Sequence, residues 1–117
     1  MSSTVAVIIP TYNSARYLAA AIESALGQTL PPHEIIVVDD GSRDAPAAVT
    51  AAYPSVKLLR QANQGVSAAR NTGVAAATSD YLVFLDADDQ LLPETLAKNL
   101  EQFAEHPDCG MVYGSYY

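Results

Sequence analysis

The chain has 117 residues, half of them hydrophobic, which is typical of one compact α/β domain and disfavours a disordered segment. Its formal net charge of −7 disfavours sequence-independent binding to nucleic acid, because an acidic surface repels the phosphate backbone. No apolar run approaches the roughly 20 residues that span a bilayer, so no membrane segment is predicted in this chain.

The first half of the chain alternates apolar runs with helical patterns. Val5–Ile9 is an almost continuous apolar run, which predicts a strand buried on both faces. Residues 14–28 place apolar side chains at helical spacing, and Asn13 or Ser14 is expected to cap this helix. A second buried strand is predicted at 35–38 and a weaker helix at 45–53.

The second half continues the alternation. Val56–Arg60 is an apolar run that also carries charge, which predicts a strand near the edge of the sheet. Residues 65–77 are rich in alanine and other small residues, as expected for a helix packed closely on a sheet. Tyr81–Leu85 is predicted as a fourth strand. A helix with proline in its first turn is predicted at 93–105, and a fifth strand at 110–113.

Strands that alternate with helices favour right-handed crossovers and a mainly parallel sheet with helices on both faces. The predicted fold class is therefore a Rossmann-like α/β domain over residues 1–117, without an internal linker. The pattern does not specify the order of the strands in the sheet. Because the chain stops after Tyr117, where an α/β sheet would usually continue, we expect it to be one part of a larger domain.

Acidic residues gather where predicted strands end, which is the edge where parallel α/β sheets bind ligands. Five of the 13 acidic residues lie at two such ends, namely Asp39 and Asp40 at one and Asp86, Asp88 and Asp89 at the other. Carboxylates that share a site repel one another, and a hard divalent cation such as Mg²⁺, Mn²⁺ or Ca²⁺ removes the repulsion. The spacing is compatible with a metal site and also with a solvated turn before the next helix.

Three other features allow two interpretations each. Residues 39–42 form either a strand-to-helix turn or part of a ligand site. Tyr12 either stacks on a base at the mouth of a cleft or packs as an ordinary tyrosine. Arg70 either pairs with an exposed carboxylate or reaches a diphosphate. The absence of G-x-G-x-x-G, Walker and G-x-S-x-G motifs disfavours dinucleotide redox chemistry, P-loop phosphoryl transfer and serine hydrolysis.

Four short motifs occur in order over essentially the whole chain. They are Ile8–Asn13 (IIPTYN), Val37–Ser42 (VVDDGS), Asn63–Gly73 (NQGVSAARNTG) and Phe84–Asp89 (FLDADD). Together they resemble the family 2 glycosyltransferases of the GT-A fold. The resemblance implies that this chain is the nucleotide-sugar-binding, N-terminal portion of such an enzyme.

The resemblance also implies roles for individual residues. Tyr12 would lie against the nucleobase, and Asp40, or Asp39 one place earlier, would accept the imide N–H of uracil. Asp86 and Asp88 match a D-x-D motif, which touches the ribose and binds a metal between the phosphates; Asp88 is the favoured direct ligand. The full expectation assigns the nucleotide to Pro10, Thr11, Tyr12, Asn13, Asp39, Asp40, Arg70, Asp86 and Ala87, and the metal, Mn²⁺ or Mg²⁺, to Asp86 and Asp88.

The predicted function is donor binding in a metal-dependent, inverting glycosyltransferase that uses a nucleotide diphosphate sugar, with UDP-sugars favoured. The general base is expected beyond residue 117, so this chain alone is expected to transfer no sugar. The acceptor, whether a sugar, a lipid-linked molecule or a protein, is not specified. Self-association through an open sheet edge is a further expectation. A non-catalytic nucleotide- or metal-binding module and a nucleotidyltransferase are the alternatives.

A single cysteine, Cys109, cannot form an intrachain disulfide, which is typical of a reducing compartment. We therefore expect a cytoplasmic chain. A longer parent protein could still lie at the cytoplasmic face of a membrane.

Overall fold

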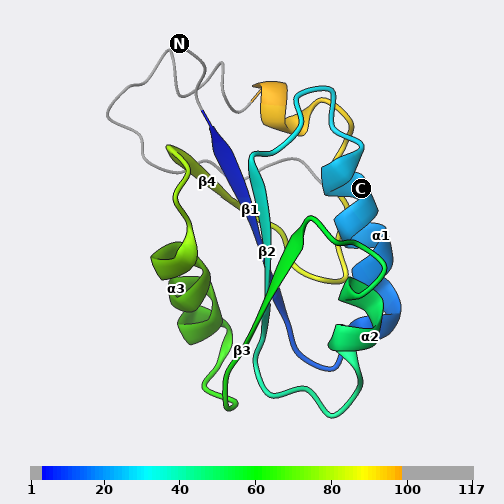
Figure 1. The fold of residues 1–117 in the computed structure, drawn as a ribbon, viewed down its shortest axis with the longest axis vertical. Coiled ribbons are helices and arrows are strands. Elements are labelled where there is room, and N and C mark those ends of the chain that lie inside the picture. The colour runs from blue at the N-terminus through cyan, green and yellow to red at the C-terminus, as the bar shows by residue number, and fades with distance from the viewer. Residues whose placement is uncertain (1–3, 99–117) are drawn as a thin grey trace.

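A four-stranded, fully parallel sheet with helices on both faces organises the chain (Figure 1). The computed structural model describes residues 4–98. The strands are β1 (Val5–Thr11), β2 (Glu34–Asp39), β3 (Val56–Arg60) and β4 (Tyr81–Phe84), in the order β3-β2-β1-β4. The parallel α/β class predicted from the sequence is confirmed. Within the described residues β3 lies at an edge, as its charged residues predict.

The two faces of the sheet carry different helices. Helices α1 (Ala15–Leu26) and α2 (Pro46–Thr50) lie on one face, and α3 (Val66–Ala76) lies on the other (Figure 1). Successive residues of a strand point to opposite faces, so alternate strand residues join different cores. The larger core includes Val7, Ile9 and Val37 with the apolar stripe of α1, and the smaller one joins Ile36 and Val38 to Ala69 of α3.

Helix α3 approaches the sheet closely because glycine and alanine occupy its inner face. Gly73 is buried, and a Cβ added there would lie 2.4 Å from Cγ2 of Ile8 in β1. A real Cβ atom does not tolerate such a distance, so only glycine fits without a shift of the helix or of Ile8. The close packing expected from the small-residue pattern is confirmed.

Strand β1 continues past its predicted end at Ile9, through Pro10 to Thr11. A proline inside a central strand would normally break a ladder hydrogen bond. Here the pairing of β1 with β4 ends at Ile8, whose carbonyl accepts from the Leu85 N–H on that side. The nitrogen of Pro10 faces the same side, beyond the end of the ladder, so its missing N–H costs no strand pairing.

Two predicted helices differ in the structure. The helix predicted at 45–53 is only α2, which ends at Thr50 and is followed by a turn before β3. The side chains of Asn13 and Ser14 do not cap α1; the Asp44 carboxylate instead accepts the Ala15 N–H at 2.8 Å. An acidic group from a distant loop satisfies that N–H and also suits the positive end of the helix dipole.

The C-terminal predictions are only partly covered by the described residues. Of the helix predicted at 93–105, residues 95–98 are helical and residues 93–94 form a turn instead. Residues 99–105 lie outside the described residues, as do the strand predicted at 110–113 and Cys109. Among the helices found in residues 4–98, none has the length and apolar character needed to cross a membrane.

Candidate functional site

A pocket opens at the carboxyl edge of the sheet, on the side that carries α3. Its volume is about 230 Å³, below the range of roughly 300–1,000 Å³ typical of pockets that enclose a whole drug-sized ligand. It therefore suits one planar group of a larger ligand. The lining residues come from the ends of β1 and β2, the β3–α3 loop and the start of α3: Pro10, Thr11, Tyr12, Asp40, Asn63, Gly65, Val66 and Ala69.

The alternation of side chains along β2 separates the two neighbouring carboxylates. Val38 belongs to the core under α3, and Val37 belongs to the core under α1. Two residues further along the chain, Asp40 lines the pocket beside α3, whereas Asp39 is not among the lining residues. Both residues are buried: the exposed fraction is 5% for Asp39 and 4% for Asp40.

Asp40 holds the β3–α3 loop by four hydrogen bonds to its carboxylate. Its Oδ1 accepts from the Gln61 side-chain amide and from the Gln64 N–H, each at 2.9 Å. Its Oδ2 accepts from the Gly65 N–H at 2.9 Å and from the Asn63 side-chain amide at 3.3 Å. A carboxylate offers about four lone-pair positions, so this group is fully used. The longest contact, to exposed Asn63, is the weakest.

These contacts also set the charge state of Asp40. Burial by itself would raise the pKa of the Asp40 carboxyl group. Hydrogen bonds from the Gln61 side chain and from the backbone N–H groups of Gln64 and Gly65 outweigh burial, so the pKa lies below its usual value. Asp40 is therefore a carboxylate at neutral pH, and it gives the lining of the pocket a negative charge.

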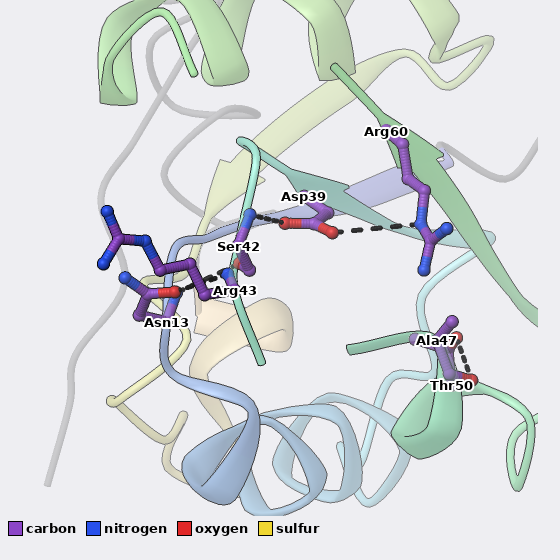
Figure 2. Close-up of polar contacts among 7 residues, drawn as sticks. All are labelled: Asn13, Asp39, Ser42, Arg43, Ala47, Thr50 and Arg60. Carbon is purple, nitrogen blue, oxygen red and sulfur yellow. Dashed lines mark hydrogen bonds and ion pairs between the residues drawn. The ribbon is translucent and has the colours of Figure 1, made fainter. Parts of the chain in front are cut away.

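Asp39 and Asn13 connect the loops on the other side of the strand ends (Figure 2). Asp39 Oδ1 accepts the Ser42 N–H at 2.9 Å, and Oδ2 lies 3.9 Å from Nε of Arg60. Asn13 has a positive φ of 51°; its N–H donates to the Ser42 hydroxyl, and its Oδ1 accepts the Arg43 N–H at 2.7 Å. In the described residues, these two side chains organise loops and do not line the pocket.

Exposed side chains form the mouth of the pocket. The exposed fraction is 46% for Tyr12 and 52% for Val66, and both residues line the pocket. Thr11 lies deeper: it is 3% exposed, and its hydroxyl oxygen is buried without a hydrogen-bond partner among the described residues. Such a group usually costs about 1–3 kcal/mol, and a ligand atom that bonded to it would remove this cost.

Arg70 extends this site toward the end of β4. Its Nη2 lies 3.4 Å from Oδ1 of Asp86, and its guanidinium stacks 5.6 Å from the centre of the Phe84 ring. Arg70 thus forms an ion pair, as one of its two interpretations predicts, and its role toward a diphosphate stays a prediction. The Nε atom is buried without a partner among the described residues, and half of the Asp86 side chain is exposed. An exposed pair at this distance is weak, so an anionic ligand can replace Asp86 as the partner.

Three carboxylates follow β4, but they do not form a closed metal site. Burial raises the pKa of Asp89, and the nearby charges of Asp88 and Asp86 raise it further. The described part of the chain holds no group of three or more His, Cys, Asp or Glu side chains placed to bind a metal. The cluster of three carboxylates considered from the sequence is therefore not a ready-made protein cage.

The β3–α3 loop overlaps the Asn63–Gly73 motif, in which the sequence predicted a role only for Arg70. The structure brings Asn63, Gly65, Val66 and Ala69 into the pocket lining. Asn63 and Gly65 also bind Asp40, from 23 and 25 residues away in the sequence. The available signal was the glycine after a polar run: Gly65 has a φ of 101°, which other residues rarely adopt. Ala87 is buried and joins the core under α1, away from the pocket lining.

Comparison with known proteins gives a consistent result. The profile described as Glycosyl transferase family 2 matches residues 6–117. Glycosyltransferase GlyG of Streptococcus pneumoniae is 36% identical over 122 residues, an alignment covering 100% of this chain and 40% of GlyG. The chain therefore spans less than half the length of this relative.

Solved structures agree with the sequence comparison. The crystal structure of S. aureus TarS 1–349 in complex with UDP matches with a TM-score of 0.80 and 30% identity, over 89% of this chain and 33% of that one. The same protein in complex with UDP-GlcNAc matches with a TM-score of 0.78 and 30% identity, over 89% and 32% of the two chains. The GT-A fold class predicted from the sequence is confirmed.

Proposed function

The chain belongs to glycosyl transferase family 2, and we propose that it is the part of such an enzyme that binds a nucleotide diphosphate sugar. One observation carries the proposal. A pocket for a planar group and the Arg70 guanidinium occupy the same carboxyl edge of the sheet, where Asp86 and Asp88 follow β4. The UDP and UDP-GlcNAc complexes of TarS, a protein of the same fold, support a uridine donor.

We propose that the base enters between Tyr12 and Val66 and reaches Asp40. The Asp40 carboxylate can accept the imide N–H of uracil if that N–H replaces the Asn63 side-chain amide, which donates to Asp40 at 3.3 Å. The unpartnered Thr11 hydroxyl is the second polar group available to the base. Adenine presents an acceptor where uracil presents its imide donor, so it would leave the Asp40 carboxylate without a donor at that position.

The diphosphate is assigned to the neighbourhood of Arg70 and Asp86. The exposed Arg70–Asp86 pair can open, which frees a guanidinium that is suited to two phosphate oxygens. Its buried Nε, which has no hydrogen-bond partner among the described residues, adds a donor. This arrangement recognises a diphosphate by charge and by the planar geometry of its donors.

The carboxylates after β4 fit a divalent metal that is shared with the donor. Mg²⁺ and Mn²⁺ are commonly held by one or two carboxylates plus phosphate oxygens, and such a site requires no three-carboxylate cage. Asp88, exposed, and Asp86 are the residues we assign to it. When bound, the metal would neutralise the negative charge that develops on the diphosphate as the sugar leaves.

The proposed reaction is transfer of a glycosyl group from the donor to an acceptor hydroxyl, with inversion at the anomeric carbon. The residues described here bind and orient the donor; none is assigned as the base that takes the acceptor proton. Because the chain aligns with 40% of GlyG, the activity and the acceptor of a complete enzyme are also proposals.

The first test is calorimetric titration of the purified protein with UDP, in Mn²⁺ and in chelator. We expect tight binding only with metal, because the metal bridges two negatively charged partners. A parallel titration with ADP should give at least about tenfold weaker binding, since a lost buried hydrogen bond costs about 1–3 kcal/mol. Equal affinities for UDP and ADP would refute the role of Asp40 toward the base, and equal UDP affinities with and without metal would refute the metal site.

A further inference from the structure

The segment that follows the Asp86–Asp89 loop is tied to helix α1 by side-chain hydrogen bonds. Ser24 Oγ accepts the Leu91 N–H at 3.0 Å and donates to the Ala21 carbonyl at 2.7 Å. One turn later, the Gln28 amide donates to the Leu92 carbonyl at 2.6 Å and accepts the Leu96 N–H at 3.0 Å. We call Ser24, which lies in α1, and Gln28, which follows the C-cap residue Gly27, the α1 clasp.

Gln28 is built into this position and is not an incidental contact. It is 5% exposed, and its amide nitrogen also donates to the Ser24 carbonyl at 2.9 Å, so both its nitrogen and its oxygen are bonded. A backbone bond from the Thr29 N–H to the Pro93 carbonyl, at 2.8 Å, continues the contact. A buried amide with this many partners specifies one arrangement of the two segments it joins.

The clasp fixes one end of the loop that carries the acidic residues. At its start, the Leu85 N–H is held by the Ile8 carbonyl at the end of the sheet. Its other end begins at Leu91, which the clasp holds. Inside the loop, the Asp89 N–H donates to the Asp86 carbonyl at 3.0 Å, which closes a turn. The exposed residues Asp86 and Asp88 thus lie between an anchor in the sheet and an anchor at the clasp. Between these anchors, Asp86 pairs with Arg70 and Ala87 is buried in the core under α1.

We propose that Ser24 and Gln28 are positioning residues for the nucleotide diphosphate: they hold the Asp86–Asp89 loop in the conformation that binds metal and phosphate. This inference rests on the proposed donor-binding function. Neither side chain touches the pocket, so both act only through the loop. The base pocket is lined by other elements, and its affinity for a nucleoside without phosphates should not depend on the clasp.

The test compares Gln28→Met and Ser24→Ala with native protein and with a matched control, Thr50→Val. Thr50 is also buried, and its hydroxyl donates within its own turn, to the Ala47 carbonyl at 3.3 Å (Figure 2). Ser24→Ala is the milder change, and it keeps the test available if Gln28→Met does not fold. Three quantities are measured: hydrogen exchange of the Leu91 and Leu96 amides, uridine affinity by NMR titration, and UDP affinity with Mn²⁺ and with chelator.

In the clasp variants we expect faster exchange at Leu91 and Leu96, unchanged uridine affinity, and at least a tenfold smaller gain of UDP affinity from Mn²⁺. The control should match native protein in all three. The inference would be overturned if Mn²⁺ raised the UDP affinity of the clasp variants as much as that of native protein. It would also be overturned if exchange at Leu91 and Leu96 did not change, or if the variants lost as much affinity for uridine as for UDP. Failure of the proposed function is distinguished by the native protein alone, which would then show no gain of UDP affinity from Mn²⁺.

Discussion

Replacement of Asp40 by asparagine tests the most connected side chain of the site. Asparagine keeps one acceptor oxygen and replaces the other by an amide that can only donate. In either orientation, one backbone N–H, of Gln64 or of Gly65, then faces another donor, and one side-chain amide of the loop also loses its acceptor. The variant therefore loses two of the four contacts to the carboxylate.

The size of the effect follows from these contacts. A hydrogen bond to a charged group contributes about 1.5–3 kcal/mol, so two losses would cost about 3–6 kcal/mol in a dry site. Gln64 and Gly65 are exposed residues, and water can replace part of the loss. We therefore expect the free energy of unfolding to fall by about 2–4 kcal/mol. At about 4 °C per kcal/mol, the Tm falls by roughly 8–16 °C.

The neighbouring carboxylate provides the matched control. Asp39→Asn can keep its bond to the Ser42 N–H and loses only the 3.9 Å contact to Arg60, whose side chain is 62% exposed. Because the Arg60 side chain is mostly in water and the contact is long, the pair contributes only about 0–1 kcal/mol, although Asp39 itself is buried. Urea unfolding at pH 7 and UDP titration measure both variants. If Asp40→Asn were as stable as native protein, or if both variants lost equal stability, the structural role assigned to Asp40 would be wrong.

Three further predictions concern packing, pH and charge. Gly73→Ala should lower the free energy of unfolding by about 1–3 kcal/mol in urea melts, because its Cβ overlaps Ile8; an increase would show that the helix shifts freely. The low pKa of Asp40 gives stability that is complete above its ordinary pKa of about 3.9 and is lost as pH falls through the lower folded value. Native protein should therefore lose more stability on acidification than Asp40→Asn, and parallel acid titrations would contradict this. Asp88→Asn should weaken UDP binding in Mn²⁺ by about tenfold or more without changing the Tm, since removing a ligand charge acts on the metal. Calorimetry should find no such loss for Asp80→Asn, whose carboxylate accepts the Thr4 N–H at the opposite end of the sheet.

Local patterns in the sequence determined the class of fold and the edge that carries the site. The apolar run at Val5–Ile9 and the small residues of 65–77 reflect burial on a sheet and close helix packing, and both features are read from neighbours in the sequence. Polar residues placed directly after strands identified the ligand-binding edge, because all strands of a parallel sheet end there. The family was predictable because four such motifs occur in one order over the whole chain.

Only the tertiary structure decided which of these polar groups meet. The strand order puts β4 beside β1, which brings Asp86 close to Arg70. The alternation of side chains along β2 directs Asp40, but not Asp39, to the pocket beside α3. A shift of one residue along a strand would exchange the sides of the sheet on which Asp39 and Asp40 lie. The periodicity of the sequence does not locate the end of a strand to within one residue. The Asp44 cap of α1 and the Gln28 clasp join segments 29 to 68 residues apart. Such pairs leave no periodic trace in the sequence, because their geometry exists only after the strands have aligned and the helices have packed on them.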